Sequence, residues 1–372
     1  MKLRFITRKL KKIWPDDRVS LCLHIGMPKT GTTAIQHFLD QNREALRRNG
    51  TLYPTCGIPT FQHAALVKSI AEPRYPWVKF NAAIECFDPV AYVNRMFEEC
   101  RQKECSRILL SSEFFWAAPA MQSDLSYHTV SEENLGYLED FVSRCGELFR
   151  VFDRVQVIVY LRRQDVWLDS FFGQQIKDGF TVPEEQQLLE PRIYLLYAEN
   201  LQLWAREFGE ENILVRIYGN QLADVTTDFC QLVGLHCSQL TSPAADAEIV
   251  NTRLTPLAAE IMQKALTLNI DSEALDLMKR VLRETSFVLI NQNRQHGSRS
   301  FAKEFLESIR TVYQEENNNL QEMFPAAKGI ADSASVDSSD IIQVIEQCPE
   351  QDMQQVLACL VSFVESNVSG QQ

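Results

Sequence analysis

The sequence lacks several features that would assign it to a class directly. It contains no run of about 18 apolar residues and no apolar core of a secretory signal at its start, so no membrane span is expected. The ten cysteines form no CxxC pair and no zinc-like Cys/His cluster, so neither a structural metal nor a disulfide scaffold is predicted. Reduced thiols fit a cytoplasmic location best. The net charge of -12 argues against nucleic acid as the principal partner, because such proteins usually carry a broad basic face.

The composition provides enough apolar material for a substantial core. The chain has 372 residues, of which 45% are hydrophobic and 10% aromatic, as is ordinary for a globular protein. We find no internal repeat, and we expect a basic segment over residues 1–18, a main domain over 19–330 and an acidic segment over 331–372. The last of these has seven acidic residues and no lysine or arginine, with an expected linker at 331–340 and an expected helix at 353–364.

The first 14 residues form an amphipathic pattern. At helical spacing, one face carries Leu3, Ile6, Leu10, Ile13 and Trp14, and lysines and arginines surround it. One interpretation is a peripheral contact with an anionic membrane surface, and the other is a basic leader without a role.

Patterns of strand and helix alternate from residue 19 onward, which favours an α/β fold with a central, mainly parallel sheet flanked by helices in three layers. The expected strands are 19–25, 51–54, 108–112, 155–161 and 212–218. The expected helices are 34–40, 62–69, 89–105 with Asp88 as cap, 194–208, 225–233, 254–268 and 301–324.

The segment from Leu23 to Thr33 indicates a phosphate site. A short apolar strand runs into a loop containing Gly26 and Gly31, and a helical pattern follows. Glycines let the backbone fold tightly around an anion, the free N–H groups of the helix start attract negative charge, and Lys29 adds a point charge. The protein is therefore expected to bind a phosphorylated ligand near its N-terminus, in a P-loop-like fold.

The position of the lysine distinguishes two kinds of loop. The common nucleoside-triphosphate loop, GxxxxGK followed by Ser or Thr, has lysine directly after the second glycine, where this chain has Thr32. Lys29 lies three residues earlier. A kinase or NTPase would also need an acidic partner for magnesium at the end of another strand, and Glu113 is a candidate. A P-loop kinase or NTPase therefore remains an alternative.

The motif Pro28–Thr33 resembles the 5′-phosphosulfate loop of sulfotransferases, which use 3′-phosphoadenosine 5′-phosphosulfate (PAPS). Farther on, Arg162 follows an apolar strand and Ser170 comes eight residues later, a spacing similar to that of the family's 3′-phosphate-binding pair. A guanidinium makes forked contacts to phosphate, and a hydroxyl two helical turns on can donate to the same group. The family often has an aspartate four residues after the arginine, whereas Asp165 lies three after Arg162, so Arg163 is the alternative ligand.

The resemblance implies a PAPS-dependent sulfotransferase domain over 19–330 that needs no metal. It would transfer a sulfuryl group by in-line displacement to a hydroxyl, or an amine, of a small-molecule, glycan or lipid-linked acceptor. The residues that would hold the 5′-phosphate are Thr30, Gly31, Thr32 and Thr33. Tyr218, at the end of an expected strand, would lie against the adenine, or else it is a core aromatic. A non-catalytic nucleotide-binding module of the same fold is a further alternative.

The expected chemistry needs two roles, stabilisation of charge on the leaving oxygen and removal of the acceptor proton. Lys29 would stabilise charge on the leaving phosphate oxygen. The base is Glu113, at the carboxyl end of a strand, or His63, whose ordinary pKa suits proton abstraction near neutrality. His24 and His37, which flank the loop, are expected to be packing or surface residues.

The acceptor site is less defined by the sequence. Aromatic residues near the expected cleft, which would stack on an acceptor or belong to the core, are Trp77, Phe114, Phe115, Trp116, Phe171 and Phe172. The basic segment 294–300 is expected to supply a late loop for the 3′-phosphate.

Overall fold

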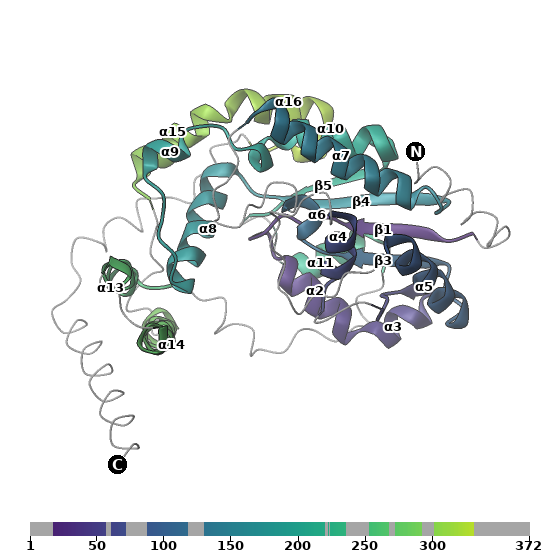
Figure 1. Cartoon of the computed structure of the whole chain (residues 1–372), viewed down its shortest axis with the longest axis horizontal. Helices are drawn as coiled ribbons and strands as arrows, with labels where there is room; N and C mark the ends of the chain where they lie inside the picture. The colour runs from purple at the N-terminus through teal and green to yellow at the C-terminus, as the bar shows by residue number, and fades with distance from the viewer. Residues whose placement is uncertain are drawn as a thin grey trace, which may run out of the picture. The chain divides into compact units, whose positions relative to one another are not determined.

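The computed structural model describes residues 18–56, 61–71, 88–117, 130–219, 222, 224–235, 253–267, 272–291 and 301–330. Five strands form one sheet (Figure 1). They are β1 (Ser20–His24), β2 (Thr51–Leu52), β3 (Arg107–Ser111), β4 (Arg154–Leu161) and β5 (Ile213–Ile217). The bounds of four strands agree with the expected ones to within one residue, and β2 ends two residues before the end of the expected strand 51–54.

Every strand pair of this sheet is parallel, in the order β2-β3-β1-β4-β5. His24 at the end of β1 is in register with Ser111 of β3 on one side and with Ile158 of β4 on the other. From β1 the chain proceeds to β2 and β3 on one side and only later to β4 and β5 on the other. The end of β1 is therefore a topological switch point, where open α/β sheets bind ligands. The α/β fold with a central parallel sheet is confirmed.

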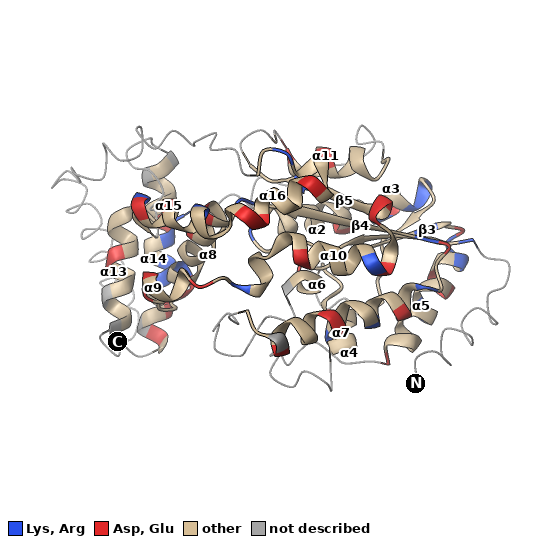
Figure 2. Ribbon diagram, turned by 90° about the horizontal axis from the view of Figure 1, so that it is seen from above, with Lys and Arg blue, Asp and Glu red and all other residues tan. Residues whose placement is uncertain are grey.

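Helices cover both faces of the sheet, as Figures 1 and 2 show. One face carries α2 (Thr32–Gln41), α3 (Arg43–Arg48) and α11 (Val225–Leu232). The opposite face carries α7 (Glu132–Phe149), α10 (Tyr197–Phe208) and α16 (Gln314–Met323). The remaining helices around the sheet are α4 (Ala64–Ala71), α5 (Pro89–Gln102), α6 (Phe114–Ala117) and the 3₁₀ turns η2 (Ile193–Leu195), η3 (Glu210–Asn212) and η5 (Pro325–Ala327).

The core under α2 and α11 fixes how the first helix leaves the sheet. Buried side chains of the two helices, Ile35, Phe38, Leu39, Phe229 and Cys230, pack on Cys22 of β1 and Tyr160 of β4. These apolar positions recur at helical spacing on one face of α2, which is why the helix lies along the sheet. Burial of this face holds the start of α2 close to the end of β1.

Two compact units divide the described chain. The first contains the sheet and the helices named above. The second comprises α8 (Gln164–Asp178), α9 (Glu185–Leu188), α13 (Pro256–Thr267), α14 (Ser272–Asn291) and most of α15 (Lys303–Val312). Within it, Asp165 and Asp169 on successive turns of α8 pair with guanidinium groups, at 2.6 Å from Arg310 and 2.7 Å from Arg253. These two ion pairs fasten α8 to the rest of its unit.

The structure also refines the expected helices. The pattern over 301–324 is divided into α15 and α16 at Tyr313, and α7 and α14 were not among the expected elements. The basic segment 1–17, Trp77, the late loop 294–300 and the acidic segment 331–372 lie outside the described residues. Within the described chain, no helix combines the length and the apolar character needed to cross a membrane.

Candidate functional site

The loop from Gly26 to Gly31, which joins β1 to α2, has an unusual backbone. Three of its residues have positive φ: 51° at Gly26, 67° at Lys29 and 81° at Gly31. A Cβ at Gly26 would lie 2.9 Å from Cγ2 of Thr32, and one at Gly31 would lie 3.1 Å from the ring of Tyr218. A side chain at Gly26 would clash with Thr32, one at Gly31 would crowd Tyr218, and both positions have a positive φ that favours glycine.

The N-terminus of α2 follows this loop directly, and no side chain caps its backbone amides. Gly31 is the N-cap, no side chain caps the first turn, and the first turn contains no acidic residue. The amides and the positive end of the helix dipole therefore favour an anion at this position. Thr30 does not compete for them, because its buried hydroxyl donates to the carbonyl of Met27 at 2.6 Å.

Arg162, which follows β4, reaches the Gly26–Gly31 loop from the neighbouring strand. Its Nη1 donates to the carbonyl oxygen of Lys29 at 3.3 Å, and its guanidinium carbon lies 5.6 Å from the centre of the Tyr218 ring. The Tyr218 backbone N–H donates to Leu161 at 2.7 Å and fixes that ring at the end of β5. A cation over an aromatic face is stabilised by about 0.5–1 kcal/mol at exposed sites. Lys29, Arg162 and Tyr218 thus come together from three separate parts of the sequence.

Glu113 lies just beyond β3, on the other side of the same loop. Its Oε2 accepts a hydrogen bond from the hydroxyl of Thr32 at 2.9 Å. Burial raises the pKa of Glu113 above its usual value of 4.5, while the Thr32 hydrogen bond and the charge of Lys29 act in the opposite direction. A carboxylate with a raised pKa beside an anion site is suited to proton transfer.

His63 occupies a different setting. Its side chain is fully buried, and its Nδ1 accepts a hydrogen bond from the backbone N–H of Ser111 at 3.1 Å. Burial lowers its pKa to about 3. Nδ1 also lies 3.3 Å from the carbonyl oxygen of Ser111, so this nitrogen faces the Ser111 backbone rather than an acceptor hydroxyl. His24 is likewise buried, with its pKa lowered to about 3 by burial and its Nδ1 2.8 Å from the hydroxyl of Ser111.

Comparisons with known proteins give limited results. No protein-family model matches the chain. An uncharacterized protein of Archaeoglobus fulgidus is 30% identical over 156 residues, which is 40% of this chain and 40% of that protein, so the match spans less than half of either. The crystal structure of a sulfotransferase from Alicyclobacillus acidocaldarius aligns with 70% of this chain and 99% of its own, at 15% identity and a TM-score of 0.37.

The other expected residues have mixed placements. The side chain of Thr33 is exposed at the start of α2, whereas Ser170 lies on α8 in the second unit.

Phe115 and Trp116 are core residues, and the Trp116 indole donates to the carbonyl of Tyr194 at 3.0 Å. His37 is half-buried against Phe61, with ring centres 3.8 Å apart.

Two contacts of the site were missed by the sequence interpretation. One is the hydrogen bond between Thr32 and Glu113, and the other is the hydroxyl of Tyr197, which donates to the carbonyl oxygen of Arg162 at 2.8 Å. The first depends on β1 and β3 being neighbours, which brings the start of α2 beside the residue that follows β3, and the sequence does not show which strands pair. The second carries no sequence signal, since it joins the start of α10 to the end of β4 through tertiary packing.

Proposed function

We propose that this chain is a PAPS-dependent sulfotransferase. The observation that carries the proposal is the approach of Arg162 to the Gly26–Gly31 loop, with Tyr218 beside its guanidinium. A helix N-terminus and an arginine together suit a ligand with two separate phosphate groups, and the aromatic ring suits the adenine of the same nucleotide. The displaced Lys29 fits a loop other than the common triphosphate loop.

The roles of the loop residues follow from their contacts. The amides at Gly31, Thr32 and Thr33 would bind the 5′-phosphate at the start of α2, joined by the exposed hydroxyl of Thr33. The hydroxyls of Thr30 and Thr32 are occupied within the protein, so these two residues would act mainly through the backbone. Arg162 would hold the 3′-phosphate, and the role of Ser170 stays a prediction from the sequence.

Sulfuryl transfer requires a proton acceptor and a group that stabilises the leaving oxygen. The acceptor hydroxyl forms a bond to sulfur while the bond from sulfur to the bridging phosphate oxygen breaks, and the electron pair stays on the 5′-phosphate. Lys29 would neutralise the charge that develops on that oxygen, and Glu113 would take the proton of the hydroxyl. Glu113 is favoured over His63 because the lone pair of His63 Nδ1 is already bonded to Ser111.

The acceptor is proposed as a hydroxyl of a carbohydrate or of a lipid-linked sugar. An assay of sulfuryl transfer from radiolabelled PAPS tests this choice of acceptor. The acceptors offered are a sugar glycoside, an oligosaccharide, a prenyl-phosphate-linked sugar and water. Phosphoryl transfer from ATP with Mg²⁺ to the same panel tests the kinase alternative. Label on an acceptor or on released sulfate supports the proposal, whereas phosphoryl transfer alone contradicts it. Binding of the nucleotide with neither reaction would indicate a non-catalytic module.

The assignment of the base has its own test. Glu113→Gln is expected to lower turnover by about 10²–10⁴-fold and to leave the affinity for PAPS unchanged, because only the proton acceptor is lost. His63→Asn is the matched control, since an amide oxygen can still accept from Ser111. Steady-state rates and separate binding titrations measure both effects. If His63→Asn loses turnover and Glu113→Gln keeps it, the roles are reversed.

A further inference from the structure

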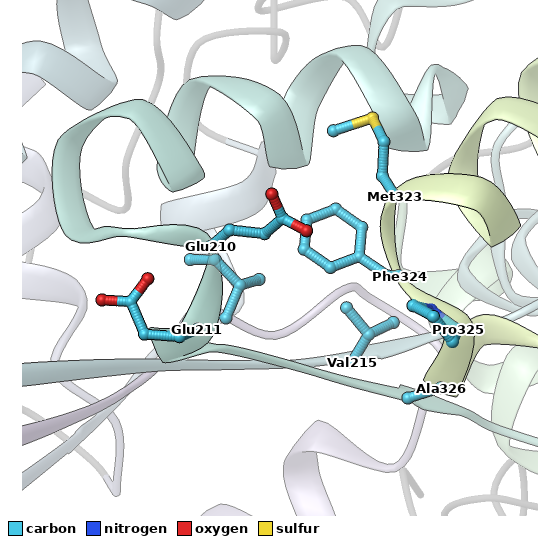
Figure 3. Close-up of a pocket in the computed structure, with 8 residues that line it drawn as sticks. Glu210, Glu211, Val215, Met323, Phe324, Pro325 and Ala326 are labelled. Carbon is cyan, nitrogen blue, oxygen red and sulfur yellow. The ribbon is translucent and has the colours of Figure 1, made fainter.

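A second pocket lies away from the Gly26–Gly31 loop, at the edge strand β5. It has a volume of about 410 Å³ and lies between η3, β5 and the corner from α16 to η5 (Figure 3). Its lining is Glu210, Glu211, Ile213, Val215, Met323, Phe324, Pro325 and Ala326. All of these residues belong to the first unit. Because η3 precedes β5, the pocket is at the amino end of the parallel strands, opposite the edge at which the loop lies.

The lining combines an apolar floor with an acidic rim. Ile213, Val215 and Phe324 are buried, whereas Glu210 and Glu211 are exposed. In Figure 3 the carboxylate of Glu210 points toward the ring of Phe324. The carboxylate of Glu211 accepts from the Asn212 side chain at 3.1 Å. An occupant that complements this site would place an apolar side chain on the floor and cations beside the two carboxylates.

The sequence itself contains such an occupant. Residues 1–14 include six lysines and arginines and no acidic residue, with Trp14 on the apolar face of the pattern. They precede β1, which begins at the same edge of the sheet as β5 because all strands are parallel. The six residue-to-residue steps from Trp14 to Ser20 span up to about 20 Å. Two strand spacings from β1 to β5 cover only about 10 Å, so Trp14 can reach the pocket.

We propose that the N-terminal segment docks in this pocket, with Trp14 on the apolar floor and Lys11 and Lys12 beside Glu210 and Glu211. Nearby charges permit this arrangement. Arg154, at the start of β4, donates to the Asn212 side chain at 3.1 Å, so its charge offsets part of the rim charge, and the two carboxylates still leave a net negative charge for the lysines. The contact is independent of the proposed catalytic activity.

Hydrogen–deuterium exchange of the full chain tests the docking. Amides of residues 3–14 are expected to exchange about tenfold more slowly than in a synthetic peptide of residues 1–17. The double change Glu210→Lys/Glu211→Lys is expected to abolish this protection. Glu184→Lys/Glu185→Lys changes the same charge at an exposed pair of adjacent glutamates and is expected to preserve it. The neutral pair Glu210→Gln/Glu211→Gln provides a milder second variant, with circular dichroism to verify folding.

A charge exchange makes the test specific. Lys11→Glu/Lys12→Glu is expected to lose protection alone and to regain it in the Glu210→Lys/Glu211→Lys background. Equal protection in all variants, or none in the unaltered chain, would overturn the proposal. In the last experiment, the same exchange is measured after anionic phosphatidylserine vesicles are added. If residues 3–14 become protected only when the vesicles are added, the segment binds membranes and the intramolecular docking is wrong.

Discussion

Lys29 has the most unusual backbone conformation of the residues at the site. A φ of 67° is unusual for a residue with a side chain, and here its carbonyl turns to accept from Arg162. Such strain often accompanies a binding loop. The motifs predicted the residues that meet here, Lys29, Arg162, Glu113 and Tyr218, because each follows a strand whose carboxyl end faces the same edge. The link from Thr32 to Glu113 could not be predicted, since it depends on which strands are neighbours.

That link makes a prediction about pH dependence. The hydrogen bond from Thr32 lowers the pKa of Glu113, so Thr32→Val is expected to raise that pKa further. A base works only when it is deprotonated, and the acidic limb of kcat/KM against pH should therefore move to higher pH in Thr32→Val.

Thr32→Ser is the matched control, because its hydroxyl preserves the hydrogen bond and the limb should stay in place. The pH profile of sulfuryl transfer, recorded for the three proteins, measures the effect. If the acidic limb lies at the same pH in Thr32→Val and in the unaltered chain, Glu113 is not the catalytic base.

At the scale of elements, short apolar runs predicted the strands well because a strand buried in a parallel sheet is apolar on both faces. The boundary between α15 and α16 was missed because no glycine or proline marks it. Tyr313 interrupts the helix there, and its buried hydroxyl accepts from the backbone N–H of Arg192 at 2.9 Å. Such a break is set by tertiary contacts rather than by local propensity.

A contact between two helices gives a prediction at this scale. Glu316 of α16 caps the start of α10, accepting from the backbone N–H of Ala198 at 2.6 Å and of Glu199 at 3.3 Å. Loss of a cap costs about 1–2 kcal/mol, so Glu316→Ala should lower the free energy of unfolding by that amount. Glu315→Ala removes an exposed neighbouring carboxylate and should change it by less than about 0.5 kcal/mol. Urea denaturation measures both, and equal effects would contradict the cap.

For the whole molecule, two buried histidines that contact Ser111 make the free energy of unfolding depend on pH. Burial lowers the pKa of His24 and of His63 to about 3, whereas the ordinary value is 6.5. The unfolded chain therefore binds more protons below pH 6.5, and stability falls with falling pH by up to about 1.4 kcal/mol per unit for each histidine.

Denaturation between pH 6.5 and 5 measures this slope. His63→Asn is expected to preserve the fold and to reduce the slope of the free energy of unfolding against pH by the contribution of one histidine. An unchanged slope in that variant would mean that His63 is not buried in its neutral form.

We propose that the Gly26–Gly31 loop and Arg162 together bind a nucleotide with two separate phosphates. Isothermal titration calorimetry with 3′-phosphoadenosine 5′-phosphate, compared with ATP plus Mg²⁺, tests it most directly. We predict tight, metal-independent binding of the first and none of the second, with a loss of about 2 kcal/mol in Arg162→Ala and little change in Arg163→Ala. Binding of ATP with Mg²⁺ alone, or an affinity unaffected by Arg162→Ala, would contradict the account.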